Sequence, residues 1–456
     1  MTQSLPIESE VRSPVETSAV SSAQKPSGGQ SMVNKLGQTL ALQAVGVIAM
    51  ALVNVIIAQR YGPVGQGYLS YYRSTVLFAV QIGLIGLPQA LVYMLNSGTM
   101  SRAWAVRFST YYGLLFTLVV VAVFAVGHLV AGDTLFGFGR LASAAIVLAA
   151  AGALLHELYR AVSLATKPVL TFNLVSIFPA LLAIVLFALW HATDFHQLVL
   201  VLVIAYAISS LLALIILGVN PISLEGLSLE ESAAKLRFSF TFGFFSAVPG
   251  TLFHLLAVLT YAYLRASSPD AAGQFSVALL LLTFTLLPLE RAAPLLFDTW
   301  SKKESGKTDR RGSFAALAHL GSLIAVVACA GVLTLATPVI GLVFGEQFLP
   351  AVLPTQVLIL SIYVFYHSRL LSTLLLSLGQ PRVNTIAAGI RGVVILGVLF
   401  FAHLDSILNA AVAWAVGEAV AMVFMVVCVR RLTGWPLAET LGVSPKWIGK
   451  MANQSP

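Results

Sequence analysis

The chain has 456 residues, of which 58% are hydrophobic and only 10% are charged, with a formal net charge of +8 and a mean hydropathy of +0.91. A water-soluble domain carries about 25% charged residues. So few charges cannot cover a water-facing surface of this size, which excludes an ordinary soluble domain. The composition predicts an all-α integral membrane protein, because lipid must be the solvent for most of the chain.

The first 31 residues differ in composition from the rest. They are rich in Ser, Pro and Gln, and they include the acids Glu8, Glu10 and Glu16. Such a segment cannot bury a core, so we predict a disordered cytoplasmic tail over 1–31. It is not a signal peptide, because the first apolar run, near 36–58, is long enough to span a bilayer.

The apolar runs that follow predict about twelve transmembrane helices, since each span needs about 20 apolar residues. The long ninth run is expected to be tilted, or broken near Pro338. The predicted spans are 36–58, 68–95, 104–127, 141–163, 168–190, 196–218, 237–263, 273–297, 313–343, 350–378, 382–402 and 405–429.

The basic residues orient these spans. Cytoplasmic segments carry an excess of Lys and Arg. With both termini placed in the cytoplasm, the outer side holds only Arg60, Arg140 and Arg265, while the basic stretch 302–311 lies inside. The positive charge therefore reflects membrane topology, and we predict no nucleic-acid partner.

Two pairs of matched segments indicate an internal repeat. PVGQGYLS (63–70) and AAGQFSVA (271–278) open the second and eighth spans, and Lys-Pro or Gln-Pro opens the fifth and eleventh. Chance similarity is the alternative, because the matches are short. Duplicated halves often place a substrate path at their interface. We predict two six-helix lobes around a central cavity, with a lobe at 32–218, a linker at 219–236, a lobe at 237–431 and a cytoplasmic tail at 432–456.

Charged residues inside the spans need an explanation, because a charge in the membrane interior costs several kcal/mol unless it is paired or hydrated. Arg391 and Glu418 fall at similar depths in neighbouring spans. They form either an ion pair between two helices or a cationic cavity wall tuned by Glu418. The candidates for substrate binding are Arg391, Arg291, Arg369 and Arg73, and those for coupling or ion pairing are Glu418, Glu290, Glu157 and His254.

Each candidate also has a structural alternative. Arg73 lies near the outer end of its span, where it could snorkel to the interface. Arg291 and Arg369 could bind phosphate oxygens bidentately, or they could snorkel or pair. His254 could relay protons or simply join two helices by a hydrogen bond.

Glycine and proline interrupt several spans. The hinge candidates are Gly83, Gly86, Pro88, Pro249, Gly250 and Pro288. These residues free backbone carbonyls and bend helices, either for packing or to open a cavity. Cys329 and Cys428 lie in apolar runs without the spacing of metal ligands or of a disulfide framework. We predict no metal, no cofactor and no catalytic residue.

Several stretches together resemble one family. Arg60, Gly62, Pro63, Gly67 and Tyr68 within 58–90 match the pattern of the Wzx-type polysaccharide flippases, members of the multidrug/oligosaccharidyl-lipid/polysaccharide exporter superfamily. FGEQFLPAVLPTQVLIL (344–360), LLSLGQPRVN (375–384) and LNAAVAWAVGE (408–418) follow the family's order. Two features depart from it: LVYMLNSG (91–98) lacks an arginine, and Asn409 replaces a glycine.

The resemblance implies a function. It implies alternating access by two six-helix lobes around a cationic cavity in the bacterial inner membrane. The cargo would be a polyprenyl-pyrophosphate-linked oligosaccharide of the undecaprenyl type, flipped to the periplasmic leaflet for O-antigen, capsule or exopolysaccharide export. Membrane lipids and other polysaccharide-assembly membrane proteins would be its partners.

Two other functions remain open. A cation-coupled multidrug antiporter of the same superfamily commonly uses a carboxylate in span one, where this chain has the uncharged Gln43 and Asn54, although Glu157 is a partial substitute. A membrane polysaccharide polymerase or glycosyltransferase would need paired carboxylates for acid–base chemistry. The short outer loops contain only scattered acids, so we do not expect an enzyme.

Overall fold

The computed structural model describes residues 32–96, 98–131, 139–190, 194–223, 229–301, 307–402 and 406–442. This part of the chain is helical and contains no strand, as predicted for an all-α membrane protein. The predicted tail over 1–31 lies outside the described residues.

The first half of the chain forms six spans. Its helices are α1 (Met32–Leu84), α2 (Leu87–Asn96), α3 (Arg102–Ala131), α4 (Arg140–Thr166), α5 (Val169–Leu189) and α6 (Leu198–Leu217), with a short 3-10 turn, η2, at Phe195–Gln197. α1 holds two spans, because the chain kinks at Gly62, whose φ of 65° and ψ of −167° are not helical. Pro63 follows at once and suits the first turn of the second helix.

The second half also forms six spans. Its helices are α7 (Leu229–Ser267), α8 (Ala271–Ser301), α9 (Lys307–Val343), η3 (Glu346–Ala351), α10 (Val352–Leu360), α11 (Ile362–Ser377), α12 (Pro381–Phe401), α13 (Ser406–Thr433) and α14 (Leu437–Thr440). The η3–α10 segment and α11 are bent by 48° relative to each other and together are long and apolar enough to count as one span. α9 runs unbroken through Pro338, and α7 begins inside the predicted linker.

The span count agrees with the sequence. Among the described residues, nine helices are long and apolar enough to cross a membrane, or ten with the bent pair. α1 is a single helix in that count although it holds two spans, and α8 contributes the shorter apolar segment Ala271–Leu286. About twelve spans result, and the protein is a multi-pass membrane protein.

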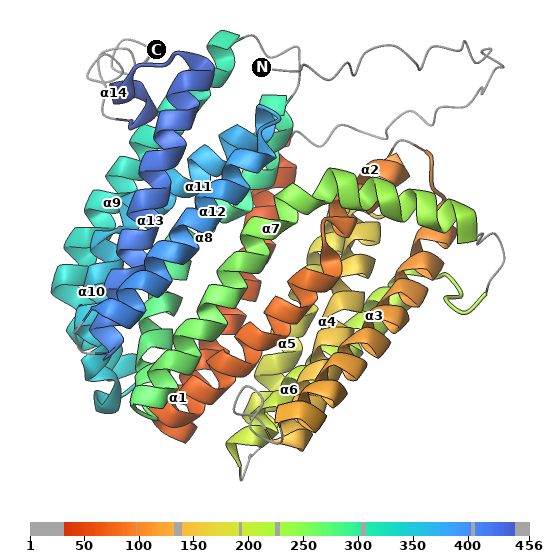
Figure 1. Ribbon diagram of the computed structural model, residues 1–456, viewed down its shortest axis with the longest axis horizontal. Helices are drawn as coiled ribbons and strands as arrows, with labels where there is room; N and C mark the ends of the chain where they lie inside the picture. The colour runs from red at the N-terminus through yellow and green to blue at the C-terminus, as the bar shows by residue number, and fades with distance from the viewer. Residues whose placement is uncertain are drawn as a thin grey trace.

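The helices gather into two lobes (Figure 1). In the first lobe α1 packs on α4 and α5, and α4 packs on α3 and α6. In the second lobe α12 packs on α7 and α13, and α11 packs on α8 and α13. The lobes meet where α1 lies against α7 and α8 and where α2 lies against α7.

Glycines let the lobes approach at both ends of this interface. We call the end with Gly62, η3 and the α7–α8 turn the distal end, and the end with α2 and α14 the proximal end. Distally, a Cβ on Gly273 would overlap the carbonyl oxygen of Pro63. Proximally, a Cβ on Gly86 would overlap the backbone of Gly243. Backbone contacts this close are possible only without side chains.

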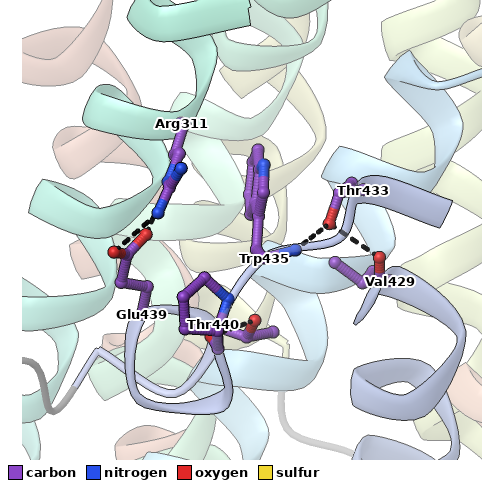
Figure 2. A network of polar contacts seen from close by, with 7 residues as sticks. Arg311, Val429, Thr433, Trp435, Glu439 and Thr440 are labelled. Carbon is purple, nitrogen blue, oxygen red and sulfur yellow. Dashed lines mark hydrogen bonds and ion pairs between the residues drawn. The ribbon is translucent and has the colours of Figure 1, made fainter. Parts of the chain in front are cut away.

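The segment after α13 folds back as a strap over the proximal end of the second lobe. Figure 2 shows Arg311 of α9 paired with Glu439 of α14, at 2.6 and 2.7 Å. Tyr363 of α11 donates a hydrogen bond of 2.6 Å to the carbonyl oxygen of Leu441. The first part of the predicted cytoplasmic tail is therefore packed against the bundle, and residues 443–456 lie outside the described part.

Candidate functional site

The first lobe contains a pocket between α1, α5 and α6. Its cavity volume is about 60 Å³, which is below the range of about 300–1,000 Å³ for small-molecule sites. Its walls are mostly apolar with a few polar groups. The lining residues are Met50, Val53, Asn54, Leu69, Ser70, Arg73, Pro179, Ala183, Phe187, Leu202, Ala205 and Tyr206.

Arg73 is the charged residue of this pocket. It lies in the second half of α1 and is half-buried. Its guanidinium makes no hydrogen bond or ion pair with any residue that the structure describes. The neighbouring Asn54 is already engaged, since it donates to the Met50 carbonyl and accepts from Gln66, both at 2.7 Å. The pocket therefore offers an unpaired cation beside apolar walls.

A second unpaired arginine approaches from the other lobe. Arg369 of α11 lies over the ring of Phe253, 5.3 Å from its centroid, and its buried Nε has no partner among the described residues. His254, next along α7, lies within electrostatic range of both Arg73 and Arg369. One guanidinium from each lobe thus lies within electrostatic range of His254, and Arg369 is also within electrostatic range of Glu418.

Arg391 and Glu418 are brought together, but away from the pocket. Arg391 donates to Glu418 across 3.0 Å, and the two side chains are only 7% and 2% exposed. Arg391 also lies 5.9 Å from the centroid of the Phe253 ring. The pair joins α12 to α13, the geometry of the ion-pair alternative.

The remaining charged candidates separate into two groups. Glu157 pairs with Arg160 one turn along α4, at 2.6 Å, with both side chains 33% exposed. Pro288, Glu290 and Arg291 belong to α8, but their side chains lie outside the described part of the chain. Among the described residues, no group of His, Cys, Asp or Glu could hold a metal ion.

The hinge candidates fall in different surroundings. α1 ends and α2 begins around Ile85 and Gly86, whose φ angles are 32° and 74°. Gly83 lies one turn earlier, and its carbonyl accepts a hydrogen bond from Tyr112. Pro88 lies in the first turn of α2.

Pro249 and Gly250 lie inside α7, which changes direction along its length in Figure 1. A proline within a helix is the usual cause of such a bend.

Sequence reasoning did not single out Ser70 and Tyr206 as pocket residues. A serine and a tyrosine in apolar spans look like packing residues until the helices are assembled. The only sequence signal was the charge of Arg73 nearby.

No protein-family model matches the chain, and no curated protein matches it. Several solved structures match the chain. An inward-facing multidrug resistance MATE family transporter of the MOP superfamily matches with a TM-score of 0.69 at 14% identity, covering 88% of this chain and 98% of that one. The fold is that of the MATE transporters.

Two further structures share the MATE fold. An outward-facing multidrug resistance MATE family transporter matches with a TM-score of 0.59 at 13% identity, over 88% of this chain and 96% of that one. A MOP superfamily transporter from Pyrococcus furiosus, described as having a binding pocket of reverse polarity, matches with a TM-score of 0.61 at 12% identity. The match covers 89% of this chain and 94% of that one.

Proposed function

We propose that the protein is an alternating-access exporter of amphipathic molecules that carry an anionic group. The observation that carries this proposal is the pair of unpaired guanidiniums, Arg73 and Arg369, one from each lobe, near His254. Guanidinium groups bind phosphate and carboxylate oxygens bidentately. The first-lobe pocket, with a cavity of about 60 Å³, would have to widen during transport before its apolar walls could hold the apolar part of the cargo.

The MATE fold supports transport by rocking of two lobes around a site between them. The lobes touch at the distal end through Pro63 and Gly273 and at the proximal end through Gly86 and Gly243, and the inward-facing transporter matches with a higher TM-score than the outward-facing one. On this proposal the distal end is the outer end and the termini lie in the cytoplasm, as the distribution of basic residues predicts.

Two specific activities compete within this proposal. Two of the three structural neighbours named above are multidrug resistance transporters, which supports multidrug transport better than oligosaccharide flipping. Cation coupling, however, commonly uses a carboxylate in the first lobe, and no carboxylate lines this pocket. We therefore favour multidrug-type export of anionic amphiphiles. A lipid-linked oligosaccharide remains the second candidate, because its pyrophosphate would suit two arginines.

The test is transport by purified protein in liposomes. Four substrates are compared. Two are xanthene dyes of opposite charge, the anion carboxyfluorescein and the cation rhodamine 6G. The other two are farnesyl pyrophosphate and a short polyprenyl-pyrophosphate oligosaccharide. We expect transport of the anions, and at least a tenfold loss with Arg73→Gln or Arg369→Gln. Arg430→Gln removes the same charge from an exposed site on α13 and serves as control. Transport of rhodamine 6G alone would contradict the proposal.

A further inference from the structure

The predicted outer side carries few arginines, so each one there calls for an explanation. Arg60 donates a hydrogen bond of 2.7 Å to the carbonyl of Phe187, near the end of α5, where carbonyls lack helical partners. Arg140 is exposed at the first position of α4. Arg265 lies in the last turn of α7 and reaches into the other lobe.

Arg265 stacks on two tyrosines of α1. Its guanidinium carbon lies 4.2 Å from the centroid of the Tyr68 ring and 4.9 Å from that of Tyr71. Guanidinium groups stack well on aromatic faces because they are planar and weakly hydrated. Since α7 belongs to the second lobe and α1 to the first, this cation–π contact joins the lobes.

The first lobe holds these rings firmly. Tyr68 stacks on Phe195 of η2 with centroids 5.4 Å apart, and it lies 5.8 Å from Tyr72 of α1. Tyr71 and Tyr72 are 2% and 0% exposed. The rings are therefore fixed in one lobe, and Arg265 is the part that would leave them.

The contact lies at the distal end of the lobe interface, where the lobes also meet through backbone and amide groups and through a buried apolar cluster. That cluster joins Ala58 of α1 to Val277 of α8 and Phe348 of η3. Gly67, directly before Tyr68, lies against Gly273. Gln59 donates a hydrogen bond of 3.1 Å to the carbonyl of Val343, and Gln347 donates one of 3.5 Å to the carbonyl of Ala58. Neutral hydrogen bonds of this kind are readily exchanged for water at an exposed end, and Arg265 adds a charged contact between the lobes to them.

We propose that Arg265 is the latch of the distal end: its stacking on Tyr68 and Tyr71 holds the outer side closed, and the outer side opens when the guanidinium leaves the rings. This inference rests on the proposed alternating access. A cation–π contact changes an equilibrium constant by a factor of about 2 to 30. Such a contact biases the lobes toward closure and still allows binding of cargo to reverse it.

The experiment measures the distal distance between the lobes with spin labels. Cys329→Ser and Cys428→Ser remove the native thiols, and labels are attached at Leu189 and Leu342, the exposed distal ends of α5 and α9. The labelled protein is studied in lipid nanodiscs by pulsed dipolar spectroscopy. We expect the wild type to show mainly a short distance, and Arg265→Gln to raise the longer-distance fraction about tenfold.

Matched variants separate the cation–π contact from other effects. Tyr68→Phe keeps the ring and should keep the wild-type distances, whereas Tyr68→Leu should open the distal end as Arg265→Gln does. The Arg265→Gln, Tyr68→Leu double variant should add little to either single change. Arg140→Gln removes an exposed arginine at the start of α4, on the predicted outer side, and should leave the distances between the labels unchanged.

The proposal that Arg265 is a latch is contradicted if Arg265→Gln and Tyr68→Leu both keep the wild-type distances. It is also contradicted if Arg140→Gln opens the distal end as much as Arg265→Gln does. The transport assay tests the cargo separately. If the latch variants open the distal end while the liposomes carry neither dye nor pyrophosphate, the latch stands and the proposed cargo fails.

Discussion

Arg391 of α12 and Glu418 of α13 form an ion pair of 3.0 Å in the interior of the second lobe. Both side chains are almost wholly buried, and Glu418 Oε1 and Arg391 Nε have no hydrogen-bond partner among the described residues. The pair is joined by one direct hydrogen bond, and Arg369 of α11 also lies within electrostatic range of Glu418. Its depth in the lobe separates it from Arg73, which lines the open pocket.

We expect Arg391→Met to lower the free energy of unfolding by up to about 3–5 kcal/mol, because the buried Glu418 would lose its hydrogen-bonded partner and keep only the electrostatic influence of Arg369. The Arg391→Met, Glu418→Leu double variant should recover most of this loss, since apolar residues of similar volume replace a buried pair well. Detergent-based unfolding measures the stability, and liposome transport of carboxyfluorescein measures function. If the stable double variant has lost transport, Arg391 belongs to the substrate path after all.

The proximal glycine pair yields a second prediction. Gly86→Ala places a Cβ into the backbone of Gly243 and also strains a φ of 74°, whereas Gly243→Ala creates the overlap alone. Both variants should separate the proximal ends, measured between spin labels at Leu164 and Leu432, both exposed there.

Gly98 provides the control for backbone strain. Its φ is 73°, but a Cβ there meets nothing within 4 Å. Gly98→Ala should therefore cost only the left-handed strain, about 1–2 kcal/mol, without moving the lobes. Equal distances in all three variants would rule out Gly86 and Gly243 as a point of lobe contact.

The sequence predicted the spans well because each needs a long apolar run and ends with recognisable residues. Gln380-Pro381 opens α12, with the proline in its first turn, and α5 begins directly after Pro168. Equal depth in adjacent spans also predicted the contact between Arg391 and Glu418. These are local or nearly local features, set by hydropathy and helix rise.

Other features depend on how the helices pack. Depth alone could not show whether Arg73 snorkels or lines a pocket, because that depends on which face of α1 meets α5 and α6. The extension of α7 back to Leu229 lies outside the apolar run, so a hydropathy criterion places the start of this helix too late in the chain. Arg265 and Tyr68 are far apart in the chain, and nothing local to either predicts their contact.

The strap yields a third prediction, from two glycines with left-handed backbone. Gly434 and Gly442 have φ angles of 71° and 65°, but only Gly442 lies against another helix, where a Cβ would lie 2.7 Å from Ala318. Both Ala variants should lose about 1–2 kcal/mol of stability to the strained left-handed backbone. Gly442→Ala should in addition lift the strap from α9 and break the hydrogen bond between Tyr363 and Leu441.

Hydrogen exchange of residues 435–442 measures the release of the strap. We expect much faster exchange in Gly442→Ala than in Gly434→Ala. Glu439→Gln weakens the ion pair with Arg311, whose side chain is 45% exposed (Figure 2), and should cost at most about 1 kcal/mol. A larger effect of Glu439→Gln than of Gly442→Ala would show that charge, rather than close packing, holds the strap.

Asn409 gives the last prediction, at a position where the resembling family has a glycine. Its side chain is 0% exposed. Its amide nitrogen donates hydrogen bonds of 3.2 Å to the carbonyl of Leu399 and 3.4 Å to that of Ala402. It also donates a hydrogen bond of 3.2 Å to the hydroxyl of Tyr263. The first two carbonyls lie at the end of α12, where helical partners run out. The asparagine therefore caps α12 and ties it to α7.

Asn409→Gly removes this cap and leaves buried carbonyls unsatisfied, so it should cost about 1–3 kcal/mol of unfolding free energy. Tyr263→Phe removes only one acceptor and should cost less, because the amide keeps both carbonyls. Asn409→Asp keeps the shape but replaces the donor with acceptor oxygens, so it should be at least as harmful as Asn409→Gly. Detergent-based unfolding of the three variants decides the matter: if Asn409→Asp is as stable as the wild type, the amide does not cap α12.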